Sequence, residues 1–472
     1  MEGADIAEAP GPLSHSALSE PAFLYPATLF GAFSLSFALP ALPTSSRRLF
    51  SSLVGAIIWV LMFQSAVWMP ILLSLVCYGL TRLLYRRRMA GCVVIALAFC
   101  FANLMRIKAM MGWLHLPISG DLAFYMFTLR LGTFAFHAED SQAVPPLTCF
   151  MSFMLFFPGI WSGPTLSWRA VQDTFDNPNT KARNFGGFLL KRGYECSMHW
   201  LAYLLLPRFN VAAVLEPAFL EHSFWYRLFY INIVLLVKKA EILFCWFIAE
   251  CTCAAAGVGC DTSALNGVNN DVFMTYNPTL DWSQNIREVI KKWNSSVQTW
   301  MALNVYKRLP IKIPLLRKLV TTTISAFWHG WDAGYYLAFS LYPVFELSQD
   351  LVWRYRWPME DRPIMAKFYQ VVRWIVSQTF IHYSQMPFVF FTFSASFIAW
   401  RAVSYYGFWV MGFFFIMGAI LPHTGLEKRE PSLQMKQQEK SSSGQQSPEG
   451  VKRSLSSQST SGSLLEEREK EQ

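Results

Sequence analysis

The sequence predicts an all-α, polytopic membrane protein, and three observations carry this prediction. Of the 472 residues, 53% are hydrophobic and 16% are aromatic, and the mean hydropathy is +0.28, which is unlike a soluble globular protein. Apolar runs recur at the length of about 20 residues that a helix needs to cross a bilayer. The formal net charge of +9 lies in the body of the chain, as basic cytosolic loops require. We therefore expect about nine to eleven transmembrane or re-entrant helices.

Three segments of different composition are expected. Residues 1–22 are polar and acidic and lack the basic start of a signal peptide, so the first apolar segment is expected to direct insertion. Residues 23–422 form a multi-span membrane domain. Residues 423–472 are rich in Ser, Gln, Lys and Glu and cannot bury enough apolar surface to fold. We predict that this C-terminal tail is disordered and cytosolic.

The first apolar segments predict three or more spans. Residues 23–42 form the first, and residues 49–80 follow without a single charge, which is too long for one straight helix. Because both flanks are basic and Gln64, Ser65 and Pro70 interrupt the run, a hairpin of two short spans satisfies the positive-inside tendency better than one tilted helix.

The next spans introduce an intramembrane charge and a broken segment. Residues 89–105 and 122–136 are apolar, and the second run contains Arg130. This arginine must snorkel, pair or line a polar cavity, and the sequence leaves the choice open. Residues 145–165 end in PGIWSGPTLSWR, whose glycines and prolines predict broken backbone at membrane depth. Such backbone is tolerated only where protein or a water-filled cavity covers it.

The middle of the chain alternates polar and apolar stretches. Residues 169–192 are polar and predict an extramembrane loop with an amphipathic continuation, whereas residues 199–215 and 225–249 predict membrane helices. The second helix is interrupted by charged residues, which we interpret as a helix end at the interface: Lys238, Lys239 and Glu241. The small residues 254–259 (AAAGVG) predict close helix approach or a turn, and residues 266–281 predict a polar loop.

The C-terminal part of the membrane domain contains three more apolar regions. Residues 334–345 and 374–391 are separated by the charged residues 349–362, and residues 395–421 form the last region. No metal site is expected, because the cysteines lack the paired spacing of a zinc site and are interpreted as small buried apolar residues. They are Cys77, Cys92, Cys100, Cys149, Cys196, Cys245, Cys251, Cys253 and Cys260.

Residues 281–306 predict one amphipathic helix. Apolar side chains recur at spacings of three and four, which places them on one face: Trp282, Ile286, Ile290, Trp293, Val297, Trp300 and Met301. A helix of this kind can lie along the membrane surface with its lysines in water. Asn294 lies beside the apolar stripe, where it could be a packing residue. It also begins a glycosylation sequon, but the basic flanks favour the cytosolic side.

His329 follows the apolar run 319–328. A lone histidine in a membrane can be purely structural, yet polar residues at that depth are expensive and usually functional. Its ordinary pKa of about 6.5 lets it accept and return a proton near neutrality. An asparagine nearby could orient a substrate or donate to a developing oxyanion. Together, Asn294 and His329 suit acyl transfer.

These motifs resemble those of a known family. WNSSVQTW (293–300), NVYKR (304–308) and SAFWHGWDAGYYLAF (325–339) are similar to the signature of the membrane-bound O-acyltransferases, within the lysophospholipid acyltransferase branch. The resemblance covers roughly residues 122–421 and includes the loop GIWSGPTLSW. It implies a multi-helix bundle around an intramembrane reaction chamber, with His329 and Asn294 as the catalytic residues.

The resemblance also implies the reaction and its partners. A fatty acyl group would pass from long-chain acyl-CoA, a co-substrate rather than a bound cofactor, to the free hydroxyl of a lysophospholipid from the bilayer. We expect an endoplasmic reticulum location and no nucleic acid partner, and the sequence does not indicate an oligomeric state. Candidate substrate-binding residues are Lys291, Lys292, Trp293, Gln298, Trp300, Tyr306, Arg308, Trp328, Tyr335 and Tyr336.

Other functions stay open at this point. The sequence IREVIKKWN (286–294) departs from the FYxDWWN-type pattern of the branch that makes neutral lipids, which makes a sterol or diacylglycerol acceptor a poorer fit. A protein acceptor is a further alternative within the family. A different class, a lipid transporter or scramblase, would use the intramembrane charges Arg130, Lys238 and Glu241 along a pathway.

Overall fold

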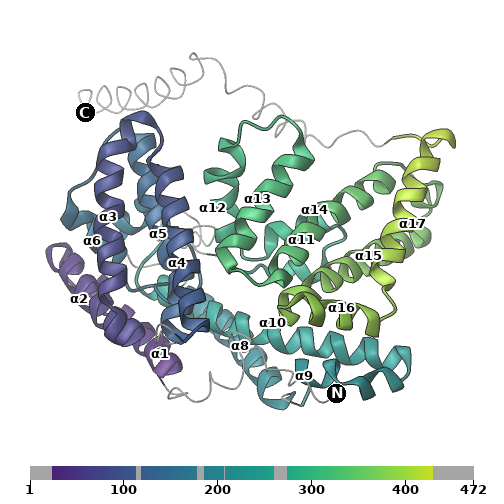
Figure 1. The fold of residues 1–472 in the computed structure, drawn as a ribbon, viewed down its shortest axis with the longest axis horizontal. Coiled ribbons are helices and arrows are strands. Elements are labelled where there is room, and N and C mark those ends of the chain that lie inside the picture. The colour runs from purple at the N-terminus through teal and green to yellow at the C-terminus, as the bar shows by residue number, and fades with distance from the viewer. Residues whose placement is uncertain (1–23, 113–117, 178–184, 207, 260–273, 429–472) are drawn as a thin grey trace, which may run out of the picture.

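The computed structural model describes residues 24–112, 118–177, 185–206, 208–259 and 274–428 (Figure 1). Regular structure in these ranges is helical, apart from two isolated backbone bridges, so the all-α prediction is confirmed. The expectations for residues 1–22 and for the tail beyond residue 428 lie outside the described residues. Among the described helices, four are long and apolar enough to cross a membrane: Thr44–Ala66, Trp68–Arg87, Ala90–Met110 and Tyr406–His423.

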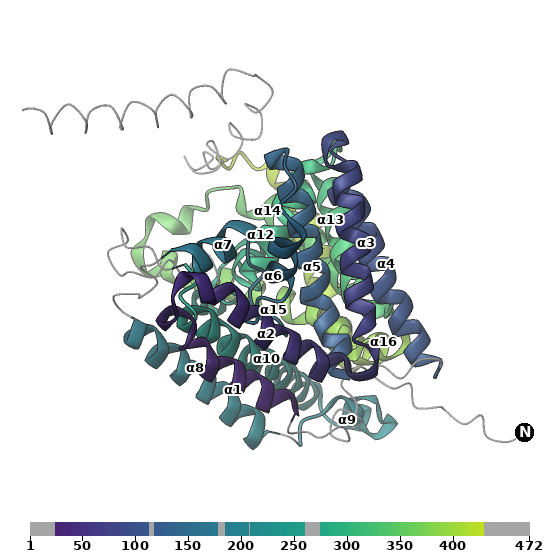
Figure 2. The same ribbon diagram turned by 90° about the vertical axis from the view of Figure 1, so that its left-hand side faces the viewer.

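The N-terminal helices form one group. α3, α4 and α5 run side by side (Figures 1 and 2), and α2 and α6 pack against α5. The predicted division of residues 49–80 into two helices is confirmed, because the chain breaks at Gln64, whose φ is +46°. The bounds are Leu24–Ser36 (α1), Thr44–Phe63 (α2), Trp68–Leu84 (α3), Ala90–Met110 (α4), Ile118–Ser141 (α5) and Leu147–Met154 (α6).

Two expectations for the next segment are wrong. Residues 168–176 are helical rather than a loop, because the Ser167 hydroxyl accepts the Ala170 N–H at 3.1 Å and caps the first turn of α7. Residues 199–215 are not one membrane helix: α8 ends at Leu205, and Asn210 caps the separate short helix α9. The bounds are Trp168–Asp176 (α7), Phe185–Leu205 (α8) and Val211–Leu215 (α9).

α10 (Phe224–Ala255) is a continuous helix of 32 residues that runs along the lower part of the molecule in Figure 1. The interpretation of its charged residues as a helix end is wrong. The helix continues because Lys238 bonds Glu241 one turn later at 3.1 Å and Lys239 bonds Asp281 at 2.5 Å. The residues that follow α10 form a turn, with Gly257 at a φ of +86°.

The predicted single helix over residues 281–306 is wrong. The structure has α11 (Ile286–Lys292) and α12 (Ser295–Asn304), with Asn294 at the break between them. In Figure 1, α12 and α13 lie between the N-terminal helices and the last helices of the chain. The remaining bounds are Pro314–His329 (α13), Ala333–Trp353 (α14), Pro363–Phe390 (α15), Phe393–Ala402 (α16) and Tyr406–Ile420 (α17).

The buried apolar residues form three clusters. The first joins the N-terminal helices to α7 and to the C-terminal end of α10, and the second joins α10 to α14, α15, α16 and α17. A smaller third cluster joins α4 and α5 to α12 and α13: Ile95, Phe99, Leu129, Phe136, Val297, Trp300, Met301, Val305 and Trp328. This third cluster lies directly beside both motifs, because it contains Val297 near Asn294 and Trp328 next to His329.

Candidate active site

Asn294 occupies a strained position between two helices. Its φ of +44° and ψ of +52° are left-handed, a conformation that asparagine tolerates better than most residues. The segment Thr275–Asn277 holds the backbone on both sides: the Asn277 N–H donates to the Lys292 carbonyl at 3.2 Å, and the Ser295 N–H donates to the Thr275 carbonyl at 2.8 Å. The Asn294 Oδ1 is buried and has no hydrogen-bond partner among the described residues. The oxygen is therefore free to accept a hydrogen bond from a substrate.

His329 is the last residue of α13. Gly330 ends the helix with a φ of +145°, a conformation that only glycine adopts easily. The imidazole is surrounded by aromatic rings of α5, α13, α14 and α15, at centroid distances of 4.6 to 5.7 Å: Tyr125, Trp328, Tyr335, Phe339 and Phe388. His329 as a whole residue is only partly buried, while aromatic rings enclose its imidazole.

One helix supports both motifs. On α5, the Thr133 hydroxyl accepts the Trp300 Nε1–H at 2.9 Å, and the Tyr125 carbonyl accepts the Trp328 Nε1–H at 3.0 Å. The Tyr125 hydroxyl also donates to the His329 carbonyl at 2.8 Å. Tyr125 and Thr133 are two turns apart on α5, which corresponds to about 12 Å. α5 therefore fixes the spacing of the Asn294 and His329 motifs.

The broken segment after α6 lies against the Asn294 helix. The Thr165 N–H donates to Ser296 Oγ at 3.1 Å, which places the loop at the first turn of α12. Arg130 orders the start of this loop by donating to the carbonyls of Met154, Phe156 and Pro158 at 3.2, 2.6 and 2.9 Å. Protein thus covers the broken backbone, as a buried irregular segment requires.

Comparison with known proteins identifies the family to which these motifs belong. The sequence model of the membrane-bound O-acyltransferase family matches residues 52–384. The chain belongs to the membrane-bound O-acyltransferase family. The resemblance seen in the sequence motifs is confirmed, and the Asn294 and His329 motifs both lie inside the matched range.

Curated relatives fall within the same family of membrane-bound O-acyltransferases. The membrane-bound acylglycerophosphatidylinositol O-acyltransferase MBOAT7 of Bos taurus is 26% identical over 385 residues, which are 70% of this chain and 80% of the relative. The protein of the same name from Homo sapiens is 25% identical over 386 residues, with the same coverage. The lysophospholipid acyltransferase of Saccharomyces cerevisiae is 26% identical over 315 residues, which are 59% of this chain and 51% of the relative.

In this membrane-bound O-acyltransferase, the structure brings some predicted substrate-binding residues to the two motifs. Tyr335 is buried with its ring centroid 5.4 Å from that of His329, and Trp328 adjoins the histidine. The ring centroids of Trp293 and Trp246 are 5.1 Å apart, with the rings tilted by 54°. The Gln298 backbone N–H donates to the Asn294 carbonyl at 2.8 Å. Tyr336 is partly exposed on α14.

The basic and remaining aromatic candidates lie apart from this group. Arg308 pairs with Asp140 at 2.7 Å and with Glu139 at 3.6 Å, so it is held by α5. Lys292 donates to Ser283 Oγ at 3.0 Å, and Lys291 is exposed. Tyr306 lies in a short 3-10 helix (η8, Tyr306–Arg308) after α12. These residues lie along α11 and after α12 rather than around the imidazole.

The charges considered for a transport pathway have partners within the chain. Arg130 is only 3% exposed and is bonded to three carbonyls. This resolves the question left by the sequence: its guanidinium is buried rather than snorkelling, and among the described residues it pairs with no carboxylate. Lys238 bonds Glu241 on the same helix. These contacts support a structural role for all three charges.

Sequence reasoning missed the residues that support His329 and α11. The Asn103 Nδ2 donates to the Phe327 carbonyl at 2.8 Å, and Arg106 lies with its guanidinium 4.3 Å from the Tyr125 ring centroid. Arg287 joins α11 to α14 through Glu346 at 2.6 Å and Asp350 at 2.7 Å. Burial alone lowers the pKa of Arg287, but these two carboxylates raise it above its ordinary value. The only available signal was the presence of polar residues at the ends of apolar runs.

Proposed function

We propose that the protein transfers a fatty acyl group from acyl-CoA to the free hydroxyl of a lysophospholipid, remaking a diacyl phospholipid. The observation that carries this proposal is the pair of reactive groups supported by α5. One is the Asn294 amide with its buried, unpartnered Oδ1, and the other is the aromatic-lined imidazole of His329. The names of the relatives, which act on acylglycerophosphatidylinositol or lysophospholipid, support the acceptor class.

The reaction needs a proton to pass from the lysolipid hydroxyl to His329 and then to the coenzyme A thiolate. His329 accepts the proton of the lysolipid hydroxyl as the oxygen attacks the thioester carbonyl carbon, and a tetrahedral intermediate forms. The carbon–sulfur bond then breaks, the ester carbonyl is restored, and the imidazolium returns the proton to the coenzyme A thiolate. An imidazole in an apolar aromatic enclosure favours its neutral form, which is the form that acts as base.

Asn294 stabilises the charge that develops on the carbonyl oxygen. Its amide NH₂ donates to the oxyanion, while its rigid backbone keeps the group aimed before the substrate arrives. Fixed donors of this kind act strongly where water is excluded. Acyl-CoA reaches the site from the cytosol, where the C-terminal tail also lies, and the lysophospholipid enters from the bilayer. The host membrane is that of the endoplasmic reticulum.

The test is product formation by purified protein reconstituted in lipid. Mass spectrometry follows the acylation of a panel of lysophospholipids by a panel of acyl-CoAs, beginning with lysophosphatidylinositol because the MBOAT7 relatives are named for that headgroup. We expect His329→Ala to lose about 10² to 10⁴-fold in rate. Asn294→Ala is expected to lose about 10² to 10³-fold.

His222→Ala supplies the matched control, because His222 is exposed and lies on the loop before α10. Its rate should equal that of the wild type. Full activity in His329→Ala would rule out the assigned base. Lipid flux in vesicles without consumption of acyl-CoA would instead support a transporter.

A further inference from the structure

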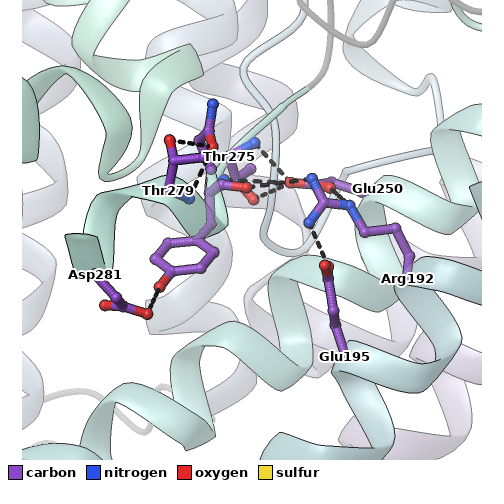
Figure 3. Close-up of polar contacts among 8 residues, drawn as sticks. Arg192, Glu195, Glu250, Thr275, Thr279 and Asp281 are labelled. Carbon is purple, nitrogen blue, oxygen red and sulfur yellow. Dashed lines mark hydrogen bonds and ion pairs between the residues drawn. The ribbon is translucent and has the colours of Figure 1, made fainter. Parts of the chain in front are cut away.

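A buried ion pair lies behind the Asn294 junction. Glu250 of α10 is fully buried and Arg192 of α8 is 5% exposed, and the Arg192 Nε lies 3.0 Å from the Glu250 Oε2 (Figure 3). Arg192 also contacts Glu195 at 2.6 Å. Removing such charges from water is costly, so a buried ion pair by itself is weak support for stability. The pair therefore raises the question of what the two charges hold in place.

Both charged residues bind the same short stretch of backbone. The Glu250 Oε1 accepts the Thr275 N–H at 2.6 Å and the Tyr276 N–H at 3.4 Å, and it also accepts the Thr275 hydroxyl. The Arg192 Nη2 donates to the Tyr276 carbonyl at 3.2 Å. A charged acceptor forms shorter and stronger hydrogen bonds than a neutral one, so the backbone of Thr275 and Tyr276 is firmly fixed.

The same helix holds this stretch at a second point. The Tyr276 hydroxyl donates to Asp281 Oδ2 at 2.5 Å (Figure 3). Lys239 of α10 pairs with the other Asp281 oxygen at 2.5 Å. Glu250 and Lys239 therefore fasten residues 275–281 to α10 from both ends. The segment is a rigid support for whatever packs on it.

What packs on it is the junction that contains Asn294. The Thr275 carbonyl accepts both the N–H of Ser295 at 2.8 Å and its hydroxyl at 3.3 Å, and Tyr276 forms an isolated antiparallel bridge with Trp293. Lys292 before the junction and Ser295 after it are thus both hydrogen-bonded to this segment. The left-handed backbone of Asn294 persists because Lys292 and Ser295 hold the chain on either side of it.

We propose that Glu250 is a positioning residue for the acyl transfer: acting through Thr275, it fixes the direction of the Asn294 amide. This inference rests on the proposed function, in which Asn294 bonds the acyl carbonyl. Glu250 itself touches no substrate. A glutamine at this position would keep the shape but remove the charge that binds Thr275 tightly and balances Arg192.

Kinetics of purified, lipid-reconstituted variants test the proposal. In Glu250→Gln and in Thr275→Val, kcat should fall about 10- to 100-fold, because small displacements of a positioned group cost rates of this order. The KM values for acyl-CoA and lysophospholipid should change by less than about twofold, since neither residue binds substrate. Thr275→Ser keeps the hydroxyl and should have a kcat close to that of the wild type.

Thr252→Val is the matched control. Thr252 is also buried on α10, 3% exposed, but among the described residues its hydroxyl donates only to the Ile248 carbonyl of its own helix, at 2.8 Å. Its kcat should equal that of the wild type. Thermal unfolding of each preparation identifies loss of fold, and Thr275→Val keeps the test decisive if Glu250→Gln does not fold.

A double-mutant cycle separates positioning from a purely structural effect. If Glu250 acts through Asn294, adding Glu250→Gln to Asn294→Ala causes no further loss of kcat. The positioning role would be overturned if the double variant lost kcat by the product of the two single losses. Wild-type kcat in both Glu250→Gln and Thr275→Val would overturn it as well. Wild-type kcat in Asn294→Ala would instead overturn the proposed function of the asparagine, so the two failures are distinguishable.

Discussion

Asn294 meets a backbone requirement and a side-chain requirement that usually fall on different residues. Its backbone must adopt a left-handed conformation to connect α11 with α12, and its side chain keeps a buried oxygen free for a ligand. Glycine would satisfy the backbone alone, and a β-branched residue would satisfy neither. Substitutions at this position can therefore change the side-chain chemistry and the stability of the junction independently.

Two substitutions of Asn294 exploit that separation. Asn294→Gly removes the amide without backbone strain, whereas Asn294→Ala removes it and places a Cβ in a left-handed conformation that costs about 1 to 2 kcal/mol. We expect both variants to lose about 10² to 10³-fold in rate and the alanine variant to unfold at the lower temperature. Thermal unfolding in detergent and product formation measure the two effects. Equal unfolding temperatures would show that the left-handed backbone carries no strain.

At the scale of elements, α5 determines where the two motifs lie. Its close approach to α12 depends on Gly132, where a Cβ would lie 2.8 Å from Trp300 Cζ2 and 2.9 Å from Ile95 Cγ1. Neither atom is the end of a flexible chain. The glycine therefore permits the contact through which Trp300 reaches Thr133.

Gly132→Ala should displace α12 and reduce activity. We expect a loss of about 1 to 3 kcal/mol of stability, typical of an overpacked core, and a lower kcat because α12 carries Asn294. Gly79→Ala on α3 is the control, since a Cβ there meets nothing within 4 Å. That change should stabilise its helix by about 0.5 to 1 kcal/mol. Thermal unfolding and initial rates check both, and an unaffected Gly132→Ala would contradict the close-packing argument.

The limits of the sequence are clearest at the α11–α12 break. The apolar spacing continues unchanged from Ile290 through Trp293 to Val297, so local periodicity predicts one helix. The break comes from bonds to Thr275 and Asn277, which are distant in sequence. Asn294 and His329 could be named from their motifs, whereas Tyr125, Thr133 and Glu250 could not, because their importance arises from contacts between helices. Polar residues inside long apolar helices, such as Glu250, are the nearest available signal.

The whole molecule presents apolar surface where a bilayer would lie. Large apolar side chains are exposed along α2 and α17, including Ile57 at 61% and Trp409 at 75%. In water such patches would promote association, but in lipid they are the ordinary outer face of a membrane protein. By contrast, Val297 near Asn294 and Trp328 beside His329 belong to a buried cluster.

The depth of this outer face is open to test on α2. Ile57 is in the middle of the candidate span Thr44–Ala66, while Leu49, 64% exposed, lies beside Arg48 near its start. Ile57→Lys should impair insertion, because a lysine at mid-membrane costs about 2.5 to 3.5 kcal/mol. Leu49→Lys should be tolerated, since its ammonium can reach the interface. Alkaline extraction of membranes compares the two, and equal retention would contradict the membrane placement of α2.

The Asn294 support also has a place in the order of synthesis. Arg192, Glu250 and Thr275 all precede Asn294 in the chain, so the residues that hold the asparagine leave the ribosome before it does. Domains assembled in this direction gain their early contacts first. The junction between α11 and α12 therefore forms after the residues that bind it have been synthesised. The left-handed turn at Asn294 depends on these earlier residues rather than on its own segment.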